Sequence, residues 1–323
     1  MNNICIIGSG QLGSRHLQGI KLSKTPLNII VFDLAADALQ VAEIRYNEVE
    51  SSVAHEIMFT SNLNDIPYKI DVAIISTSSG PRRKMVEELL KHKKVRYMIL
   101  EKVLFQNLED FDAVEELLKE KGTKAWVNCI RRNFRDYTEI KKAFCNQNAI
   151  CNVTGNEWGM MCNLIHFIDY MSFVFEDITF KLDLESLLPE LVPAKREGYY
   201  ELYGTIIARF NNGRIGSITC NKGGEIDMTL SITGCEDQVV LCESRNIAYW
   251  RKIDGKSDFV EKYLSFPFQS QTTGELIEEI LSTGNCKLTG YKESAILHKQ
   301  MLQPIIHFIN SKIDSKINYF PCT

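Results

Sequence analysis

The chain has 323 residues, a formal net charge of −4 and a charged fraction of 24%. This length exceeds what one hydrophobic core usually serves, so it predicts two domains, and the slight acidity argues against a nucleic-acid partner. No apolar run is long enough for a membrane span, and the first residues lack the layout of a signal peptide. We therefore expect a cytoplasmic protein with no membrane partner.

The ten cysteines include no Cys-x-x-Cys pair. Cys5, Cys129 and Cys220 lie in apolar runs, where a free thiol behaves as a small hydrophobic group. We therefore expect reduced structural cysteines and no metal site.

The first 130 residues alternate between short apolar runs and segments with helical periodicity. Strands are expected at residues 4–7, 28–32, 72–76, 97–100 and 125–130. Helices are expected at residues 12–22, 35–45, 81–92 and 108–121. Apolar strands separated by helices predict an α/β domain, a Rossmann-type doubly wound parallel sheet, which we assign to residues 1–122.

The pattern changes after about residue 121, and we assign residues 123–323 to a second domain of the α+β class. Helices are expected at residues 134–145, 161–175, 274–282 and 294–309. Strands are expected at residues 179–184, 199–210, 214–221, 228–233 and 238–242. Asn211-Asn212-Gly213 predicts a hairpin turn, since Asn and Gly accept positive φ angles. The second domain should therefore contain a large, mainly antiparallel open sheet.

The loop Gly8-Ser9-Gly10-Gln11-Leu12-Gly13 follows the first strand and opens a helix. In a dinucleotide site Gly8 would allow the turn, Gly10 would let the backbone approach the pyrophosphate, and Gly13 would let helix and strand pack closely. The phosphates would lie at the helix N-terminus, beside Gln11 and Leu12. The alternative is a glycine turn with a structural role alone.

Asp33 ends the second strand, twenty residues after Gly13. Its carboxylate can accept hydrogen bonds from a ribose but would repel a 2′-phosphate, and Leu34, Ala35 and Ala36 offer no arginine to neutralise one. The expected cofactor is therefore NAD(H). The alternative is an aspartate that caps the helix at Ala35.

Several further segments resemble one enzyme family, the glucose–fructose oxidoreductase and inositol dehydrogenase (Gfo/Idh/MocA) family. They are Arg15-His16, Ile75-Ser76-Thr77-Ser78, Ile99-Leu100-Glu101-Lys102, Val127-Asn128 with Arg131-Arg132, and residues 156–169. The resemblance implies a Rossmann domain joined to an open-sheet domain. It also implies hydride transfer between a nicotinamide and a secondary alcohol or ketone of a sugar, cyclitol or nucleotide sugar.

The resemblance implies catalytic roles for Lys102 and His166, and two departures bear on them. Val103 stands where the family has proline, so a cis peptide bond is not expected there. Cys162 stands where many family dehydrogenases have aspartate, which leaves His166 as the general base with help from Asn163 or Asp169. The form of the motif at residues 156–169, with Cys162 in place of aspartate, resembles that of family members associated with bacterial surface-polysaccharide biosynthesis.

Chemistry supports both candidates. Histidine titrates near working pH and suits an acid–base role, although His166 could also be a core histidine. Lys102 follows a buried strand at the carboxyl edge of the sheet, where it could contact both the cofactor and the substrate oxygen and stabilise a developing alkoxide. The alternative is a solvated lysine.

Other residues of these segments are candidates for cofactor or substrate binding. Glu101 could orient Lys102 or the nicotinamide ribose, and Thr77 and Ser78 could bind the cofactor or be ordinary turn residues. Arg131 could hold a substrate phosphate or carboxylate, or form part of a solvated charge pair.

Substrate contacts are also expected from Asn163, His166 and Asp169, close together on one helix. We expect a small-molecule substrate and a homo-oligomer, either a dimer or a tetramer, in which the second domain could present a sheet face. The competing hypothesis is a non-catalytic dinucleotide sensor on the same fold.

Overall fold

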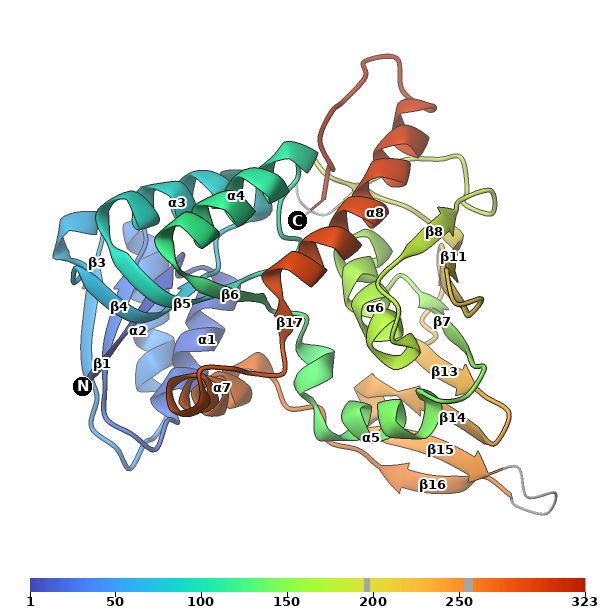
Figure 1. Cartoon of the computed structure of the whole chain (residues 1–323), viewed down its shortest axis with the longest axis horizontal. Helices are drawn as coiled ribbons and strands as arrows, with labels where there is room; N and C mark the ends of the chain where they lie inside the picture. The colour runs from blue at the N-terminus through green and yellow to red at the C-terminus, as the bar shows by residue number, and fades with distance from the viewer. Residues whose placement is uncertain (195–197, 253–257, 323) are drawn as a thin grey trace. The chain divides into compact units, whose positions relative to one another are not determined.

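A computed structural model describes residues 1–194, 198–252 and 258–322. It contains two compact units, which can be followed along the chain in Figure 1. The first consists of Met1–Phe105, Glu109–Asn128 and Pro267–Tyr291, and the second of Gln106–Leu108, Cys129–Phe266 and Lys292–Thr323. This division differs from the expected one at residue 122, because the chain returns to the first unit near its C-terminal end.

The first unit is built on a seven-stranded sheet. Its strands are β1 (Asn2–Ile7), β2 (Leu27–Phe32), β3 (Glu56–Thr60), β4 (Lys69–Ile75), β5 (Lys94–Leu100), β6 (Lys124–Val127) and β17 (Thr289–Gly290). The order is β17-β6-β5-β4-β1-β2-β3, with β1 to β6 parallel and β17 antiparallel to β6. The predicted doubly wound sheet is confirmed. The strand order reverses between β1 and β4, and folds of this type bind ligands outside the carboxyl ends of the strands at such a point.

Five helices cover this sheet. They are α1 (Gln11–Lys21), α2 (Ala36–Asn47), α3 (Ser79–His92), α4 (Leu108–Lys121) and α7 (Gln269–Thr283). Figure 1 shows α3 and α4 on one face and α1 and α7 on the other. Ile4 to Ile7 of β1 are fully buried, as expected for a strand covered on both faces. The sequence does not predict β3, because this edge strand is mostly half-exposed and lacks a continuous apolar run.

Helix α7 packs against α1, although the two lie far apart in the sequence. A Cβ atom on Gly19 would lie 2.9 Å from the carbonyl oxygen of Gln269, and one on Gly274 would lie 2.6 Å from the carbonyl oxygen of Gly19. Both positions therefore need glycine for the helices to approach this closely. The predicted helix at residues 274–282 is real but begins earlier, at Gln269.

The second unit is built on an eight-stranded sheet. Its strands are β7 (Ile150–Asn156), β8 (Phe180–Asp183), β11 (Gly204–Phe210), β12 (Ile215–Asn221), β13 (Thr229–Thr233), β14 (Asp237–Cys242), β15 (Ile247–Lys252) and β16 (Val260–Tyr263). The order is β16-β15-β14-β13-β7-β12-β11-β8, and all neighbours are antiparallel except β7 and β12. The prediction of a large, mainly antiparallel sheet is confirmed. The short strands β9 (Val192–Pro193) and β10 (Tyr200–Glu201) form a separate pair.

Local backbone geometry explains the hairpin and one broken strand. Asn211-Asn212-Gly213 turns β11 into β12, with a φ of +85° at Gly213. The strand expected over residues 199–210 is interrupted before Gly204, whose φ is +107°. The sequence also fails to predict β7, because its residues alternate between buried and exposed positions and include Asn and Gly.

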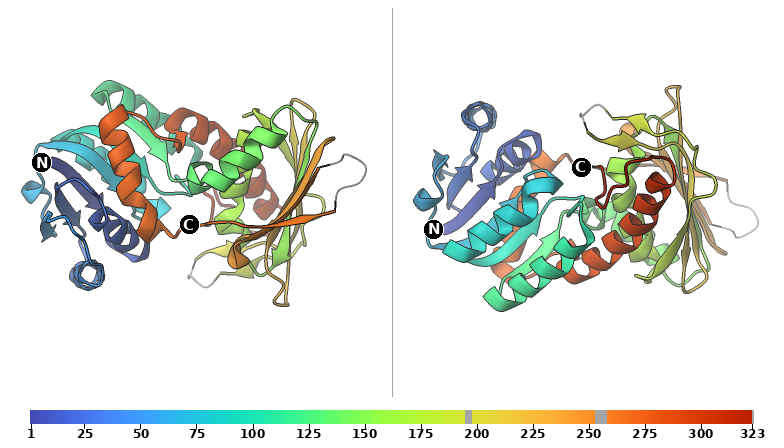
Figure 2. Two further views of the ribbon diagram at one scale, coloured as in Figure 1. Left: turned by 90° about the horizontal axis from the view of Figure 1, so that it is seen from below. Right: turned by 90° about the horizontal axis from the view of Figure 1, so that it is seen from above.

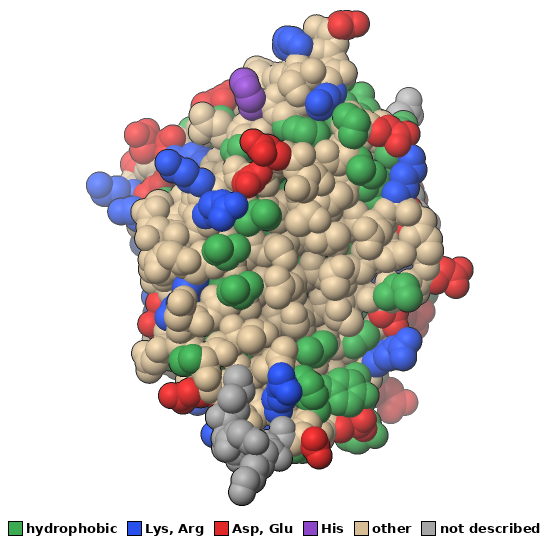
Figure 3. All heavy atoms as spheres, turned by 90° about the vertical axis from the view of Figure 1, so that its right-hand side faces the viewer, with side chains coloured by type: hydrophobic (Ala, Val, Ile, Leu, Met, Phe, Trp, Pro, Cys, Tyr) green, Lys and Arg blue, Asp and Glu red, His purple; other side chains and the backbone are tan. Residues whose placement is uncertain are grey.

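One face of this second sheet is covered by helices, and the other is open. The helices of this unit are α5 (Arg135–Phe144), α6 (Met160–Phe175) and most of α8 (Tyr291–Asn310). Figure 2 shows them along one face of the sheet. The opposite face, seen in Figure 3, is a broad area with few charged side chains at its centre. No helix in the described ranges is long and apolar enough to span a membrane.

Candidate functional site

The glycine loop joins β1 to α1, where the strand order reverses. Gly8 has a φ of +92°, which other residues rarely adopt, and its N–H donates to the carbonyl oxygen of Phe32 (2.9 Å). A Cβ atom on Gly13 would lie 1.9 Å from the carbonyl oxygen of Gly8. The fold itself therefore requires glycine at both positions.

Gly10 is different, because no atom of the fold lies where its side chain would be. Its φ is −60°, and a Cβ atom would meet no heavy atom within 4 Å. It is the N-cap of α1, and in the described chain no side chain caps this helix and no acidic residue lies in its first turn. Gln11 and Leu12, which follow, are exposed. The open space and uncapped helix start suit a bound anion such as a pyrophosphate.

Asp33, directly after β2, is hydrogen-bonded to the glycine loop. Its Oδ2 accepts hydrogen bonds from the N–H (2.6 Å) and Oγ (3.1 Å) of Ser9, and its Oδ1 accepts one from the N–H of Ala35 (3.0 Å). The side chain is half-buried. Asp33 therefore holds the loop in place and also puts a negative charge beside it.

Arg45 of α2 also reaches the start of α1, which the sequence does not indicate. Its guanidinium donates to Oε1 of Gln11 (2.8 Å) and to Oγ of Ser14 (2.6 Å). The residues directly after Asp33 supply no cation, but a more distant residue of α2 does. Only the spacing of residues along α2, once the packing of α2 on α1 is known, could have revealed it.

Thr77 and Ser78 follow β4, beside the glycine loop. A Cβ atom on Gly8 would lie 2.9 Å from the backbone nitrogen of Thr77, so the two loops are in contact. Oγ1 of Thr77 is buried and has no hydrogen-bond partner among the described residues, whereas buried hydroxyl groups normally have one. Ser78 is exposed and is the N-cap of α3. The unpaired hydroxyl fits a place where a polar ligand binds.

Glu101, at the end of β5, is buried and lies in a hydrogen-bond network. Its Oε1 accepts from Nδ2 of Asn128 (2.6 Å) and lies 2.8 Å from Nε2 of His16. The Nδ1 atom of His16 is 3.0 Å from Oγ1 of Thr273, and Nδ2 of Asn128 also donates to Oε1 of Gln269 (2.9 Å). Two of these partners come from α7, which short-range sequence patterns could not show.

This network sets the charge of Glu101. Burial by itself would raise the pKa of the Glu101 carboxyl, but the hydrogen bond and charge of His16, the hydrogen bond of Asn128 and the charge of Lys102 hold it below its ordinary value. The carboxylate is therefore ionised directly beside Lys102 in the chain. His16 matters as its partner, a role that the sequence alone did not assign.

Lys102 is half-buried, and the segment after it is held by Arg82. The guanidinium of Arg82 donates to the carbonyl oxygens of Leu104 (2.8 Å), Val103 and Thr77, and burial lowers the pKa of Arg82 to about 10. The Lys102–Val103 peptide bond is cis, which corrects the expectation of a trans bond without proline. Residue type alone could not show this isomer, because it depends on the contacts of the whole segment.

In the second unit, His166 lies on the less buried side of α6. Cys162 is one turn before it, and both are half-buried, whereas most residues of this helix are buried. His166 is thus not enclosed in the core. Asn163 lies on the same side, and its Nδ2 donates to the carbonyl oxygens of Trp158 and Gly159 (3.0 Å each), at the start of the helix.

Arg131 and Asp169 have partners inside the second unit. Nε and Nη2 of Arg131 donate to the two carboxylate oxygens of Glu243, each at 2.8 Å. Asp169 is fully buried, and its Oδ2 accepts from Nε of Arg132 (2.7 Å). Both side chains thus have partners that the fold itself supplies, and their substrate contacts stay a prediction.

Glu201 of β10 was missed by the sequence analysis. Its Oε1 accepts from the N–H of Met161 (2.7 Å), in the first turn of α6, where a negative charge is favourable. Burial raises the pKa of the Glu201 carboxyl, and the nearby charge of Glu157 acts in the same direction. Its position in the chain, far from α6, gave no signal of this contact.

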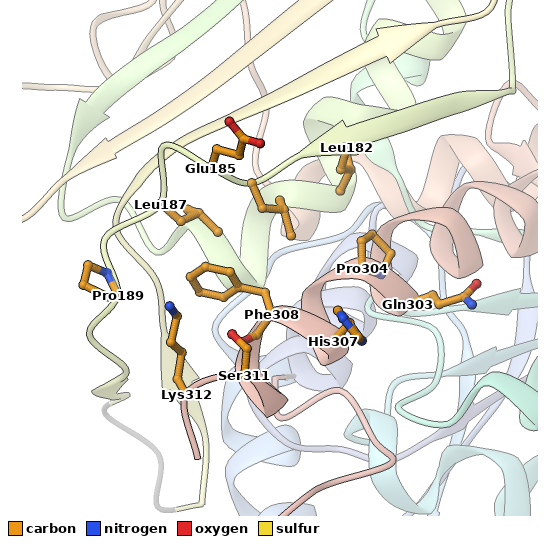
Figure 4. A pocket seen from close by; sticks show the side chains of 11 residues that line it. Leu182, Glu185, Leu187, Pro189, Gln303, Pro304, His307, Phe308, Ser311 and Lys312 are labelled. Atoms are coloured by element: carbon orange, nitrogen blue, oxygen red, sulfur yellow. The ribbon is translucent and has the colours of Figure 1, made fainter. Parts of the chain in front are cut away.

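A separate cavity of about 880 Å³ lies in the second unit, between the segment that begins in β8 and the end of α8 (Figure 4). Its walls include Leu187, Pro304 and Phe308, with His307 and Lys312 nearby. No residue that the sequence singled out lines this cavity. It is therefore distinct from the candidate site.

Comparison with known proteins identifies the first unit. Residues 2–129 match the family described as the oxidoreductase family, NAD-binding Rossmann fold (GFO_IDH_MocA). This part of the chain is the NAD-binding domain of a Gfo/Idh/MocA oxidoreductase. The predicted family is thus confirmed, and the glycine loop, Thr77 and the Glu101-Lys102 pair lie in an NAD(P)-binding domain. No curated protein matches the chain in sequence.

Solved structures share the fold of the whole chain. UDP-N-acetylglucosamine 3-dehydrogenase from Acidithiobacillus ferrooxidans has 14% identity and a TM-score of 0.71, covering 93% of this chain and 95% of its own. Biliverdin reductase from Synechocystis sp. PCC 6803, in complex with biliverdin and NADP+, has 11% identity and a TM-score of 0.70, covering 93% and 96%. A super-repressor mutant of Gal80p from Saccharomyces cerevisiae has 12% identity and a TM-score of 0.71, covering 95% of each chain. The TM-scores show that these proteins and the chain share a common fold.

Proposed function

We propose that this Gfo/Idh/MocA protein is an NAD(H)-dependent oxidoreductase. It would transfer hydride between the nicotinamide and a secondary alcohol or ketone of a sugar, cyclitol or nucleotide sugar. The observation that carries the proposal is the open, uncapped loop at Gly10 together with Glu101 and Lys102 at the same carboxyl edge of the sheet. A shared fold with a UDP-N-acetylglucosamine 3-dehydrogenase supports the substrate class.

The choice of NAD(H) over NADP(H) rests on Asp33. Its carboxylate is fixed by Ser9 and Ala35, so it cannot easily turn away from a 2′-phosphate. Arg45, a cation beside the start of α1, is already hydrogen-bonded to Gln11 and Ser14. The balance of charge therefore favours a ribose with a free 2′-hydroxyl.

The roles of the protein groups follow from their chemistry. When bound, the cofactor supplies or accepts the hydride. Lys102, next to ionised Glu101 in the chain, would hold the substrate oxygen and stabilise negative charge that develops on it. His166 would accept the hydroxyl proton during oxidation and return it during reduction. Thr77 and the glycine loop would hold the cofactor.

A substrate screen tests this function. The purified protein would be incubated with NAD+ and a panel of nucleotide sugars, free sugars and cyclitols, and NADH formation followed by absorbance. We expect turnover with at least one member of the panel, lost in Lys102→Met. Tight NADH binding without turnover on any member, in either direction, would contradict the proposal.

The alternative is a non-catalytic dinucleotide sensor, which two observations favour. Cys162 replaces the aspartate expected at this position from the family resemblance, and a Gal80p super-repressor mutant shares the fold. The same screen separates the two functions, since a sensor would bind NADH but give no turnover.

We further propose that the protein is a homodimer or homotetramer that uses the open sheet face. Along the central strands β7, β12 and β13, uncharged side chains alternate with buried ones, among them Asn152, Thr154, Ser217, Thr219 and Ser231. Figure 3 shows few charged side chains at the centre of this face. Sedimentation velocity should show an oligomer that Thr154→Lys dissociates, whereas Asn148→Lys, at an exposed position before β7, should not. A monomeric wild type would contradict the proposal.

A further inference from the structure

Asn128 directly follows β6 and is buried. Its backbone N–H donates to the carbonyl oxygen of Leu100 (2.9 Å), which places it beside the end of β5. Its Nδ2 donates to Oε1 of Glu101 (2.6 Å) and to Oε1 of Gln269 (2.9 Å). Both partners are oxygen atoms that need a donor.

These two acceptors fix the orientation of the amide. If the amide were turned over, Oδ1 of Asn128 would face the ionised carboxylate of Glu101, and two acceptors would be opposed. The oxygen must therefore point away from Glu101 and Gln269. In this orientation Oδ1 is buried and has no hydrogen-bond partner among the described residues.

A buried carbonyl oxygen without a donor is rare in proteins and calls for a partner. The missing partner must carry an N–H or O–H group. Phosphates and carboxylates in their ionised forms only accept hydrogen bonds, so they do not fit this position.

The position along the sheet edge indicates which part of a dinucleotide would come here. The unpaired hydroxyl of Thr77 lies at the end of β4, next to the glycine loop that would hold the phosphates. Asn128 lies at the end of β6, two strands further along, or roughly 10 Å at the usual strand spacing. Lys102 lies between them, after β5. Along the carboxyl edge of the sheet, the cofactor phosphates would therefore lie at the glycine loop after β1, and the nicotinamide ring would lie near the ends of β5 and β6.

We propose that Oδ1 of Asn128 accepts a hydrogen bond from the carboxamide NH2 group of the nicotinamide. This inference rests on the proposed function and specifies how the ring is oriented. The Glu101–Asn128–Gln269 network then has a second use: by occupying both hydrogens of the Asn128 amide, it presents only an acceptor to the ring.

The test is a double-mutant cycle between the protein and the cofactor. Calorimetric titrations would compare NAD+ with 3-acetylpyridine adenine dinucleotide, in which a methyl group replaces the NH2, on the wild type and on Asn128→Ala. The wild type should bind the analogue about fivefold more weakly than NAD+, as expected for the loss of one neutral hydrogen bond. In Asn128→Ala this difference should disappear, while ADP-ribose, which lacks the ring, should bind both proteins alike.

Gln269→Met is the matched control, since it removes an acceptor from the network but keeps Oδ1 of Asn128. It should retain the preference for NAD+ over the analogue. Equal binding of NAD+ and the analogue by the wild type would overturn the inference without any variant, as would an unchanged ratio in Asn128→Ala. Failure of the wild type to bind either dinucleotide or ADP-ribose would overturn the proposed function as well, so the two failures can be told apart.

Discussion

Replacement of Gly10 by alanine should abolish most cofactor binding and leave the fold intact. Gly10 has an extended backbone, with φ −60° and ψ −156°, and a new Cβ would meet no heavy atom within 4 Å. We therefore expect the free energy of unfolding to stay within about 1 kcal/mol of wild type. The methyl group would occupy the space in front of the loop and prevent at least one charge-assisted hydrogen bond to a phosphate, worth about 1.5–3 kcal/mol. The affinity for NADH should fall by about tenfold or more.

Gly13→Ala provides the contrast, because its Cβ would lie 1.9 Å from the carbonyl oxygen of Gly8. Either the loop or the start of α1 must move, and overpacking of this kind costs about 1–3 kcal/mol. The melting temperature and the affinity for NADH should therefore fall together in Gly13→Ala, but only the affinity in Gly10→Ala. Thermal melts and calorimetric titrations with NADH measure both quantities. Wild-type affinity in Gly10→Ala would show that the phosphates do not bind at this loop and would refute the reasoning.

Four other residues give testable expectations. Calorimetry should show tighter binding of NADH than of NADPH, a difference that Asp33→Asn narrows; equal affinities in the wild type would remove Asp33 from cofactor choice. Lys102→Met should slow single-turnover hydride transfer far more than it weakens NADH binding, and near wild-type transfer would exclude Lys102 from the mechanism. His166→Asn should lower turnover by about 10²–10⁴-fold with NADH affinity kept, whereas loss of folding with full activity per folded molecule would indicate a core histidine. Burial raises the pKa of Glu201 in spite of its hydrogen bond from Met161, so ionisation of Glu201 lowers the stability of the fold. This loss of stability builds up as pH rises from the unfolded-state pKa to the raised pKa. The melting temperature of Glu201→Gln relative to wild type should therefore rise from about pH 4 to about pH 7, and a pH-independent difference would contradict this.

The parallel sheet of the first unit could be predicted from the sequence because each central strand is buried on both faces. Ile4 to Ile7 and the strand at residues 97–100 therefore form unbroken apolar runs. Strands with one exposed face gave weaker signals. The central strand β7 was missed for this reason, since Asn152 and Thr154 point to the open face.

The candidate site was predictable only where neighbours in sequence are also neighbours in space. The glycine loop and the Glu101-Lys102 pair meet this condition. The ion pairs of Arg131 with Glu243 and of Asp169 with Arg132 join residues far apart in the sequence, so they could not be predicted before the fold was known. A charged side chain in a motif can serve the substrate or the core, and only the identity of its partner separates the two.

The return of α7 to the first unit has a consequence for how the protein is made. A fragment that ends after Asn128 would lack Thr273 and Gln269, the partners of His16 and Asn128, and would leave the α7-covered side of α1 exposed to water. On the ribosome, the nucleotide-binding half must therefore wait for about 150 further residues, on the order of ten seconds of synthesis. The second half of the chain emerges during that interval, so the cofactor site is among the last parts of the protein to be completed.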